Sequence, residues 1–181
     1  MTLLAIAGPS TVGKDSTWVR VAETVGFVRE VPYTTRERRS NEQEGRDYRY
    51  VQIPVFHEMI RSNGLTEWDH VLGHYYGTAG TLKARVEHGE HVVLQVLARM
   101  AVRLQRRSMA NVRTVLLLSS DSRTLEARLR ARGYGPSDIE QRLHHAIEEE
   151  AHAPLFDYVI PDADILSDVD VARRIADIVG E

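Results

Sequence analysis

The sequence predicts an α/β fold in three layers, with a five-stranded parallel sheet between two layers of helices. Two observations support this prediction. Continuous apolar runs, typical of strands buried on both faces of a parallel sheet, recur along the 181 residues. Segments with helical periodicity separate these runs, and such alternation builds parallel sheets through right-handed crossovers. The strands are expected at residues 2–7, 26–31, 91–97, 113–119 and 156–160.

One region breaks the alternation of strands and helices. Residues 33–78 are polar and are interrupted by Gly45, Pro54 and Gly64, so we interpret them as an inserted substrate lobe. Residues 133–137, between two predicted helices, are expected to belong to a mobile lid. The helices are expected at 14–24, 79–88, 98–109, 121–132, 137–153 and 168–179. The prediction is one domain, 1–181, with a core of 1–32 and 90–181, a lobe of 33–89 and a lid of about 133–140.

Composition narrows the class of protein. The chain has no cysteine, which excludes disulfides, thiol catalysis and zinc–thiolate sites. Its net charge of −3 argues against a nucleic-acid-binding surface. No apolar run approaches the ~20 residues of a membrane span, and we interpret the N-terminal segment as a first strand, not a signal peptide. We therefore expect a cytoplasmic protein with no nucleic-acid or membrane partner.

A glycine-rich loop follows the first strand and opens a helix, which is the context of a phosphate-binding P-loop. The segment reads Gly8-Pro9-Ser10-Thr11-Val12-Gly13-Lys14. Glycines let the backbone wrap a phosphate with its N–H groups inward, and the helix N-terminus adds a favourable dipole. Lys14 would neutralise the β and γ oxygens of ATP. The residues expected to bind ATP are Gly8, Ser10, Val12, Gly13, Lys14, Asp15 and Ser16.

The position after the lysine departs from the usual motif. A Ser or Thr hydroxyl normally follows and binds Mg²⁺, but here Asp15 comes first and Ser16 second. Ser16 can supply that hydroxyl. Asp15 is either a second metal ligand or a carboxylate stabilised by the dipole at the helix start. The predicted metal site is therefore Asp15 and Ser16, with ATP and Mg²⁺ as cofactors.

Several motifs occur in the order typical of one family. They are Thr34-Thr35-Arg36 with Arg39, Gly45-Arg46-Asp47-Tyr48, Thr66-Glu67-Trp68, Gly73-His74-Tyr75-Tyr76-Gly77-Thr78, the arginine-rich run 125–133, and Phe156-Asp157-Tyr158-Val159-Ile160. The chain resembles guanylate kinases over nearly its whole length. The resemblance implies an ATP-dependent nucleoside monophosphate kinase with GMP as the favoured acceptor. It further implies small nucleotides as partners and a monomer or a homodimer.

The resemblance also implies an acceptor-phosphate site. Arg36 and Arg39 match two arginines that bind the GMP phosphate, and a guanidinium fork suits a phosphate dianion. Tyr48 and Tyr76 match tyrosines that donate hydrogen bonds to the same phosphate. The expected substrate-binding residues are Arg36, Arg39, Tyr48, Glu67, Tyr76, Gly77, Thr78 and Gln95.

Further matches fall on the base and on the lid. Glu67 and Thr78 match groups at the guanine edge. Arg128, Arg132 and Arg142 match lid arginines, which would offset the charge that spreads over the transferred phosphoryl group. With Lys14 they form the expected catalytic set.

Four features depart from the guanylate kinase pattern. Gln95 and Leu97 stand where that family has an aspartate pair for guanine recognition and the Mg²⁺ environment. Pro32, Ile147 and Asp162 replace a serine, an arginine and an asparagine. Ribose 1,5-bisphosphate phosphokinase has a similar Gly-Lys-Asp-Ser loop and also lacks the aspartate pair, so that activity is one alternative. A non-catalytic guanylate-kinase-like binding module is the other, although the lysine of the P-loop argues against it.

Overall fold

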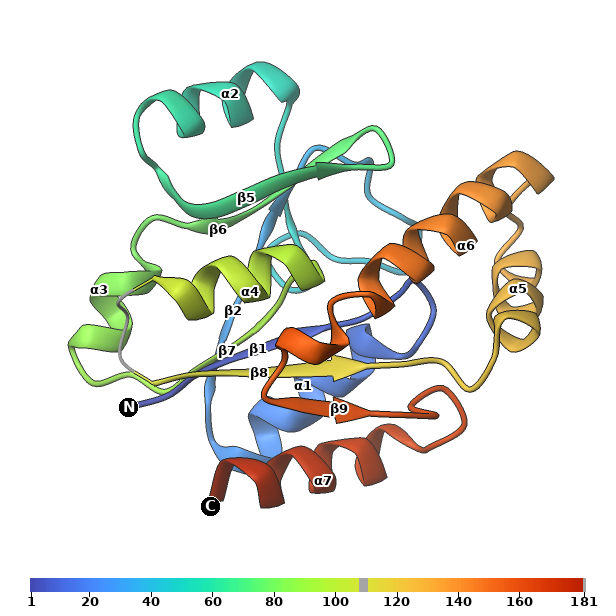
Figure 1. Cartoon of the computed structure of the whole chain (residues 1–181). Helices are drawn as coiled ribbons and strands as arrows, with labels where there is room; N and C mark the ends of the chain where they lie inside the picture. Colours follow the sequence, from blue (N-terminus) through green and yellow to red (C-terminus); the bar gives the residue numbers. More distant parts are fainter. Residues whose placement is uncertain (108–110, 181) are drawn as a thin grey trace.

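The structure is a computed structural model that describes residues 1–107 and 111–180, apart from the side chain of Asp15. Five strands within these residues form a parallel sheet in the order β2-β7-β1-β8-β9 (Figure 1). Each overlaps one of the predicted runs, so the predicted α/β fold with a five-stranded parallel core is confirmed. The strands are β1 (Leu3–Ala7), β2 (Val28–Glu30), β7 (Val92–Gln95), β8 (Val112–Leu117) and β9 (Tyr158–Ile160).

Helices cover both faces of this sheet. Helices α1 and α7 pack on one face, and α3 and α4 pack on the other (Figure 1). The helix predicted over 98–109 is α4, which is assigned as far as Arg106, and residues 108–110 lie outside the described residues. The helices are α1 (Lys14–Val25), α2 (Ile53–Arg61), α3 (Leu82–Glu87), α4 (Ala98–Arg106), α5 (Ser122–Ala131), α6 (Pro136–Glu150) and α7 (Asp168–Gly180).

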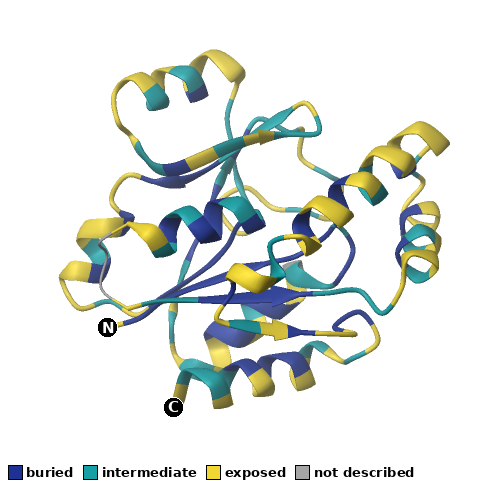
Figure 2. Cartoon of the chain, in the orientation of Figure 1, coloured by how far each residue is buried: buried dark blue, intermediate teal, exposed yellow. Residues whose placement is uncertain are grey.

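The side chains of β1 divide between two cores, because successive residues of a strand point to opposite faces. Leu3 and Ala5 pack in the core under α3 and α4, whereas Leu4 and Ile6 pack in the core under α1 and α7. All four are fully buried, and the central strands are dark blue in Figure 2. Burying a side chain such as that of Ile6 contributes about 1.5–3 kcal/mol. This rigid sheet fixes the loops that follow its carboxyl ends.

The polar stretch that breaks the alternation folds into a second, four-stranded sheet in the order β4-β3-β6-β5. Helix α2 packs on this sheet through Phe56, its buried residue. Gly77 makes that contact possible, since a Cβ there would lie 2.9 Å from Phe56 Cζ and 3.0 Å from Leu65 Cδ1. The strands are β3 (Tyr33–Thr34), β4 (Arg49–Tyr50), β5 (Leu65–Val71) and β6 (His74–Ala79).

The predicted lid region is the connection between α5 and α6. The turn adopts a positive φ of 83° at Gly133, and α6 begins at Pro136, a residue favoured at the first helical position. Leu129 and Ile139 pack the two helices together, with Tyr134 against them. Mobility of this region and the division into core, lobe and lid stay predictions. Helix α3, placed in the lobe by its sequence range, packs its two buried residues into the core.

Within the residues that the structure describes, none of the helices combines the length and the apolar character needed to cross a membrane.

Candidate active site

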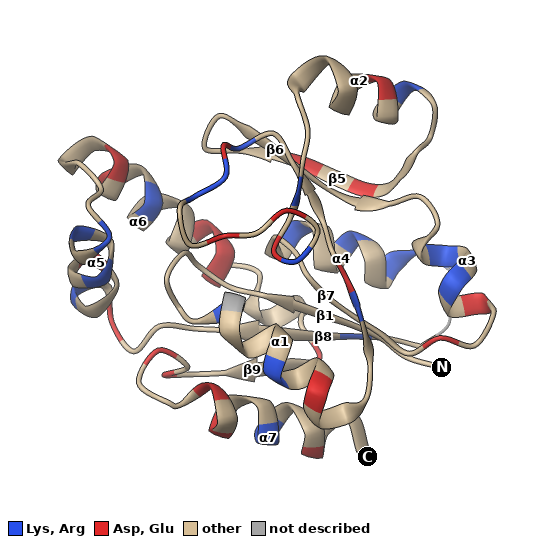
Figure 3. Ribbon diagram, turned by 180° about the vertical axis from the view of Figure 1, so that it is seen from behind, with Lys and Arg blue, Asp and Glu red and all other residues tan. Residues whose placement is uncertain are grey.

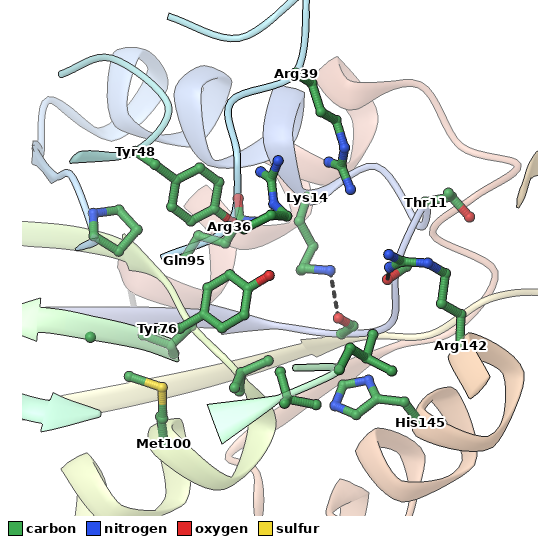
Figure 4. A pocket seen from close by; sticks show the side chains of 18 of the residues that line it. Thr11, Lys14, Arg36, Arg39, Tyr48, Tyr76, Gln95, Met100, Arg142 and His145 are labelled. Atoms are coloured by element: carbon green, nitrogen blue, oxygen red, sulfur yellow. Dashed lines mark hydrogen bonds between the residues drawn. The ribbon is translucent and has the colours of Figure 1, made fainter. Parts of the chain in front are cut away.

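One cavity lies beside the carboxyl ends of β1 and β7, where open α/β sheets bind their ligands. It brings together the glycine-rich loop, the second sheet, the start of α4 and the helices of the lid region (Figure 4). Its lining includes Gly8, Ser10, Thr11, Lys14, Pro32, Arg36, Arg39, Tyr48, Val71, Leu72, Tyr76, Gly77, Gln95, Val96, Leu97, Met100, Arg132, Arg142 and His145.

Two glycines shape the loop between β1 and α1. At Gly8, φ is 145°, and a Cβ would lie 2.3 Å from the carbonyl oxygen of Leu117, so only glycine fits there. At Gly13, φ is 107°, and its carbonyl accepts from the Ser16 and Thr17 N–H groups at 3.2 and 3.1 Å. The loop therefore places the N-terminus of the 12-residue helix α1 at the cavity. The free N–H groups and the dipole at this end of a helix favour the binding of a phosphate.

The lysine of this loop lies over the loop itself. Lys14 Nζ donates to the carbonyl oxygens of Gly8 and Pro9 at 2.5 and 2.6 Å. Ser16 Oγ donates to Gly13 O at 3.1 Å and is exposed at the start of α1. Val12, also predicted to contact ATP, is 1% exposed and packs in the core, so only its backbone can serve a ligand.

The two predicted metal ligands, Asp15 and Ser16, belong to the first turn of α1. The predicted ligand Asp15 has a side chain that lies outside the described residues. Among the residues that are described, no group of three or more His, Cys, Asp or Glu side chains could hold a metal ion.

The two predicted acceptor arginines are organised by one carboxylate, that of Glu42. Arg36 binds it through two hydrogen bonds of 2.7 and 3.0 Å, and Arg39 adds its backbone N–H at 2.9 Å and its guanidinium at 3.2 Å. The Tyr50 hydroxyl donates to the same carboxylate at 2.8 Å. Burial works to raise the pKa of Glu42, but these hydrogen bonds lower it to about 2. A charged carboxylate thus fixes two cations at the cavity wall.

Sequence reasoning missed this role of Glu42. The signal in the sequence is its spacing, six residues after Arg36 and three after Arg39. Pairing with Glu42 raises the pKa of Arg36 although burial opposes the charged form. Arg36 therefore keeps its positive charge beside Glu42.

The two predicted tyrosines stand beside these arginines. The rings of Tyr48 and Tyr76 lie edge to face with centroids 6.1 Å apart. The Arg36 guanidinium carbon lies 5.3 Å from the centre of the Tyr48 ring. Gln95, at the end of β7, lies with its amide nitrogen 3.4 Å from the Tyr48 hydroxyl. Both hydroxyls and the Gln95 amide thus face the same cavity (Figure 4).

The three predicted lid arginines do not act alike. Arg132 and Arg142 line the cavity. Arg142 Nη1 donates to Ser10 Oγ at 3.3 Å, which joins α6 to the glycine-rich loop. Arg128 instead donates to the backbone carbonyls of Thr11 and Asp164. It therefore links the glycine-rich loop to the segment that follows β9.

A lid tyrosine links these groups, and sequence reasoning missed it. Arg39 Nη2 donates to the Tyr134 hydroxyl at 2.5 Å. The guanidinium of Arg142 stacks on the Tyr134 ring at 4.1 Å from its centre. The Tyr134 side chain therefore contacts both Arg39 and Arg142, and Arg142 in turn reaches the glycine-rich loop.

Two residues predicted at the guanine edge do not line the cavity. The Glu67 carboxylate accepts from Arg103 Nε at 2.9 Å and from Arg107 Nε at 3.3 Å. The Thr78 hydroxyl faces the Glu67 backbone and accepts from its N–H at 3.1 Å. Their contact with a base stays a prediction, whereas Gly77 and Gln95 do line the cavity.

A buried carboxylate also stands behind the cavity. Glu149 is 3% exposed, and its two oxygens accept from the Ala98 N–H at 2.9 and 3.1 Å. Burial raises the pKa of Glu149 to about 7, against the lowering effect of Lys14. Burial lowers the pKa of His145, 3.8 Å from Glu149, to about 4. Between these values both groups are neutral, so their contact is not an ion pair.

Comparisons with known proteins agree with this arrangement. The family model described as guanylate kinase matches residues 1–175. A guanylate kinase of Gloeobacter violaceus is 36% identical over 176 residues, covering 96% of this chain and 85% of that protein. One from Polaromonas is 34% identical, covering 87% and 78%. The crystal structure of guanylate kinase from Anaplasma phagocytophilum has a TM-score of 0.76 at 25% identity, covering 99% of this chain and 84% of that one. The chain belongs to the guanylate kinase family.

Proposed function

We propose that the protein transfers the γ-phosphoryl group of ATP to GMP, giving ADP and GDP. The proposal rests above all on one observation. A phosphate-binding loop with Lys14 and an arginine–tyrosine set with Arg36, Arg39, Tyr48 and Tyr76 face one another across a single cavity. Two anion-binding sets in one cavity suit one phosphate donor and one phosphate acceptor. The acceptor phosphate is already an anion, so the reaction requires no general base.

The donor nucleotide would bind with its phosphates on the loop. Backbone N–H groups at the start of α1 and the helix dipole favour the phosphate charge. Thr11 Oγ1 and Arg142 Nε are buried and have no hydrogen-bond partner within the described residues. Both would gain a partner from a phosphate oxygen beside the loop. Lys14 would leave the two carbonyl oxygens that it now contacts and neutralise the transferring group.

The acceptor phosphate would bind on the opposite wall. Arg36 and Arg39 present guanidinium groups that are already fixed by Glu42, so little side-chain freedom is lost when a phosphate binds. Arg132 and Arg142 line the same cavity. There they would stabilise charge that spreads over the phosphoryl group in the transition state.

Mg²⁺ is part of this proposal, and the residues present fit it. The Ser16 hydroxyl donates to Gly13 O at 3.1 Å, which leaves its oxygen lone pairs available to a cation. A metal held by one hydroxyl and by substrate phosphates needs no cage of carboxylates. When bound, Mg²⁺ neutralises phosphate charge. We further propose Asp15 as a second ligand, so that Asp15→Asn raises the Mg²⁺ concentration for half-maximal activity about 10-fold, or by about 1.4 kcal/mol.

The experiment that tests the function is ADP release with ATP and Mg²⁺ across GMP, dGMP, AMP, UMP, CMP and ribose 1,5-bisphosphate. We expect release that depends on GMP. Release with ribose 1,5-bisphosphate and with none of the nucleotides would contradict the proposal. The cytoplasmic location predicted from the cysteine-free composition stays a prediction.

A further inference from the structure

The chain enters the second sheet directly after β2 and leaves it after β6, shortly before α3 begins (Figure 1). A buried carboxylate, that of Glu30, belongs to the first of these places and contacts the second. We infer that Glu30 is a positioning residue, which fixes the second sheet at the angle to the core that aligns the two sides of the cavity. This inference rests on the proposed function, because it concerns the alignment of the proposed donor and acceptor.

The contacts of Glu30 join three elements. Its side chain is 2% exposed. One oxygen accepts from the Ala79 N–H, at the end of β6, at 3.4 Å. The other oxygen binds the guanidinium group of Arg85 on α3. Arg85 also binds Glu90, which follows α3, at 2.8 and 3.0 Å. The end of β2, the end of β6 and helix α3 therefore meet at one carboxylate.

Burial makes this junction rigid. It raises the pKa of Glu30, whereas the attraction of Arg85 favours the charged form. A buried carboxylate has no water to replace a lost partner, so breaking either contact would leave a charge unsatisfied. Gly80 is equally confined, because its N–H donates to Gly64 O at 2.8 Å and a Cβ there would lie 2.9 Å from the same oxygen. The junction therefore has little freedom to change its angle.

The β5 edge of the second sheet contacts the core in a different way. Figure 3 shows the acidic segments of β5 opposite the basic segments of α4. There the Asp69 carboxylate lies 2.5 Å from Arg99 and 3.1 Å from Arg103, whose side chains are 41% and 40% exposed. Water can replace the contacts of exposed charges at little cost. We therefore expect this edge to move more easily than the junction at Glu30, which acts as a pivot.

The groups on the proposed acceptor side depend on this pivot. Tyr76 lies three residues before Ala79 on β6, which is about 10 Å at ~3.3 Å per residue. Strand β3 pairs with β6 and leads to Arg36. A small rotation at Glu30 would therefore move Tyr76 and Arg36 together relative to the glycine-rich loop. A misplacement of about 1 Å can lower the rate of a reaction about 10²-fold.

Two alanine variants that affect the same arginine test the role of Glu30. Glu30→Ala removes the contacts with Ala79 and Arg85, so we expect kcat with GMP to fall about 10- to 100-fold. Its Kd for ATP, measured without GMP, should change by less than about 3-fold, because the glycine-rich loop belongs to the core. Glu90→Ala is the matched control, since Glu90 also binds Arg85 but is 41% exposed and lies between α3 and β7. We expect that control to lower Tm slightly and to keep kcat within about 2-fold of the parent value.

A conservative variant separates positioning from stability. Glu30→Gln keeps one oxygen for one of the two donors, so we expect its kcat to fall less, about 3- to 10-fold. A folded Glu30→Ala variant with kcat within about 2-fold of the parent value would reduce Glu30 to a stabilising residue and overturn the inference. If Glu30→Ala does not fold, the same result for Glu30→Gln overturns it. No ADP release by the parent protein with GMP would instead remove the proposed function.

A distance measurement tests the pivot without any substrate. The chain has no cysteine, so Glu58→Cys on α2 and Arg173→Cys on α7, both at exposed positions, provide two unique sites for spin labels. Double electron–electron resonance then reports the distribution of distances between the second sheet and the core. We expect this distribution to widen about 2-fold in Glu30→Ala, or in Glu30→Gln if the alanine variant does not fold, and to keep its width in Glu90→Ala. An unchanged width in the Glu30 variant overturns the inference whichever acceptor the enzyme uses.

Discussion

The proposed donor side and the proposed acceptor side of the cavity are built by different means. The donor loop is one contiguous segment, and its backbone N–H groups would bind the phosphates. Gly8 and Gly13 allow its shape, with φ values of 145° and 107°. The acceptor side consists of side chains from separate segments, held in place by the Glu42 carboxylate. A backbone site tolerates many side-chain changes but depends on its glycines and its one lysine. A side-chain site depends on each partner that orients another.

This difference between the two sides predicts different kinetic effects when their residues are replaced. Under the proposed function, groups on the donor loop would meet charge that moves during transfer, so we expect their loss to lower kcat. Groups on the acceptor wall would hold a phosphate whose charge is already present, so we expect their loss to raise KM. The following predictions test this division, beginning with the largest expected effect.

Lys14→Ala tests the donor side. We expect kcat to fall by about 10²-fold or more, because the ammonium group neutralises charge on the transferring phosphoryl group. Steady-state kinetics with saturating ATP and GMP measures this, and Tm reports whether the fold is intact. Near-normal turnover by a folded variant would remove the donor role from this loop.

Arg39→Ala tests the acceptor side. We expect KM for GMP to rise about 10- to 100-fold through loss of a charge-assisted phosphate contact, while KM for ATP changes by less than about 3-fold. Arg38→Ala is the neighbouring control, since Arg38 is exposed and donates to the Glu42 carbonyl at 2.6 Å. If both variants raise KM for GMP equally, a general charge effect replaces the specific contact.

Glu149→Gln tests the support behind both sides. The pKa of Glu149 rises from 4.5 to about 7 on folding, so its stabilising contribution is complete below pH 4.5 and disappears as pH rises through 7. Between pH 5 and 8 the parent protein should therefore lose about 1–3 kcal/mol of unfolding free energy relative to Glu149→Gln.

Urea unfolding at several pH values measures that difference. Lys14, Arg99 and His145 face Glu149 in both proteins, so the difference between the two pH profiles isolates the carboxyl group of Glu149. The neutral His145, whose pKa is about 4, gains its stabilising effect as pH rises from 4 to 6.5 and acts in the opposite direction. Parallel pH profiles for the two proteins would contradict a raised pKa at Glu149.

Tyr134→Phe tests whether the lid connects the two sides. The change removes the hydroxyl that accepts from Arg39 at 2.5 Å but keeps the ring on which Arg142 stacks. We expect KM for GMP to rise about 3- to 10-fold through one lost hydrogen bond to a charged group, with kcat little changed.

Tyr158→Phe offers a chemically matched control for that variant. Its hydroxyl accepts from Arg113 at 2.8 Å on the edge strand β9, and Tyr158 does not line the cavity. Both variants should lower Tm slightly, but only Tyr134→Phe should change KM. Equal KM values in the two variants would reduce Tyr134 to a packing role.

Sequence alone determined the core of this protein and its donor loop. The five strands are continuous apolar runs, and burial on both faces leaves such runs few alternatives to a central parallel sheet. The loop from Gly8 to Lys14 is equally local, since its glycines and lysine are contiguous. Helix α2 and the strands of the second sheet were not predicted, because Gly45, Pro54 and Gly64 interrupt the polar stretch in which they lie and indicate breaks between elements.

Only the tertiary structure decided which side chains meet at the acceptor side. Tyr134 lies 95 positions from the arginine whose hydrogen bond it accepts, and no local pattern signals that contact. Glu67 belongs to a family motif in the sequence, yet its carboxylate lies against Arg103 on α4 and Arg107 directly after it. A carboxylate binds whichever cations the fold brings within reach. The sequence motif around Glu67 therefore cannot predict which residues its carboxylate contacts. A glycine in a turn with positive φ can be predicted from the sequence, because the requirement lies in the local backbone itself.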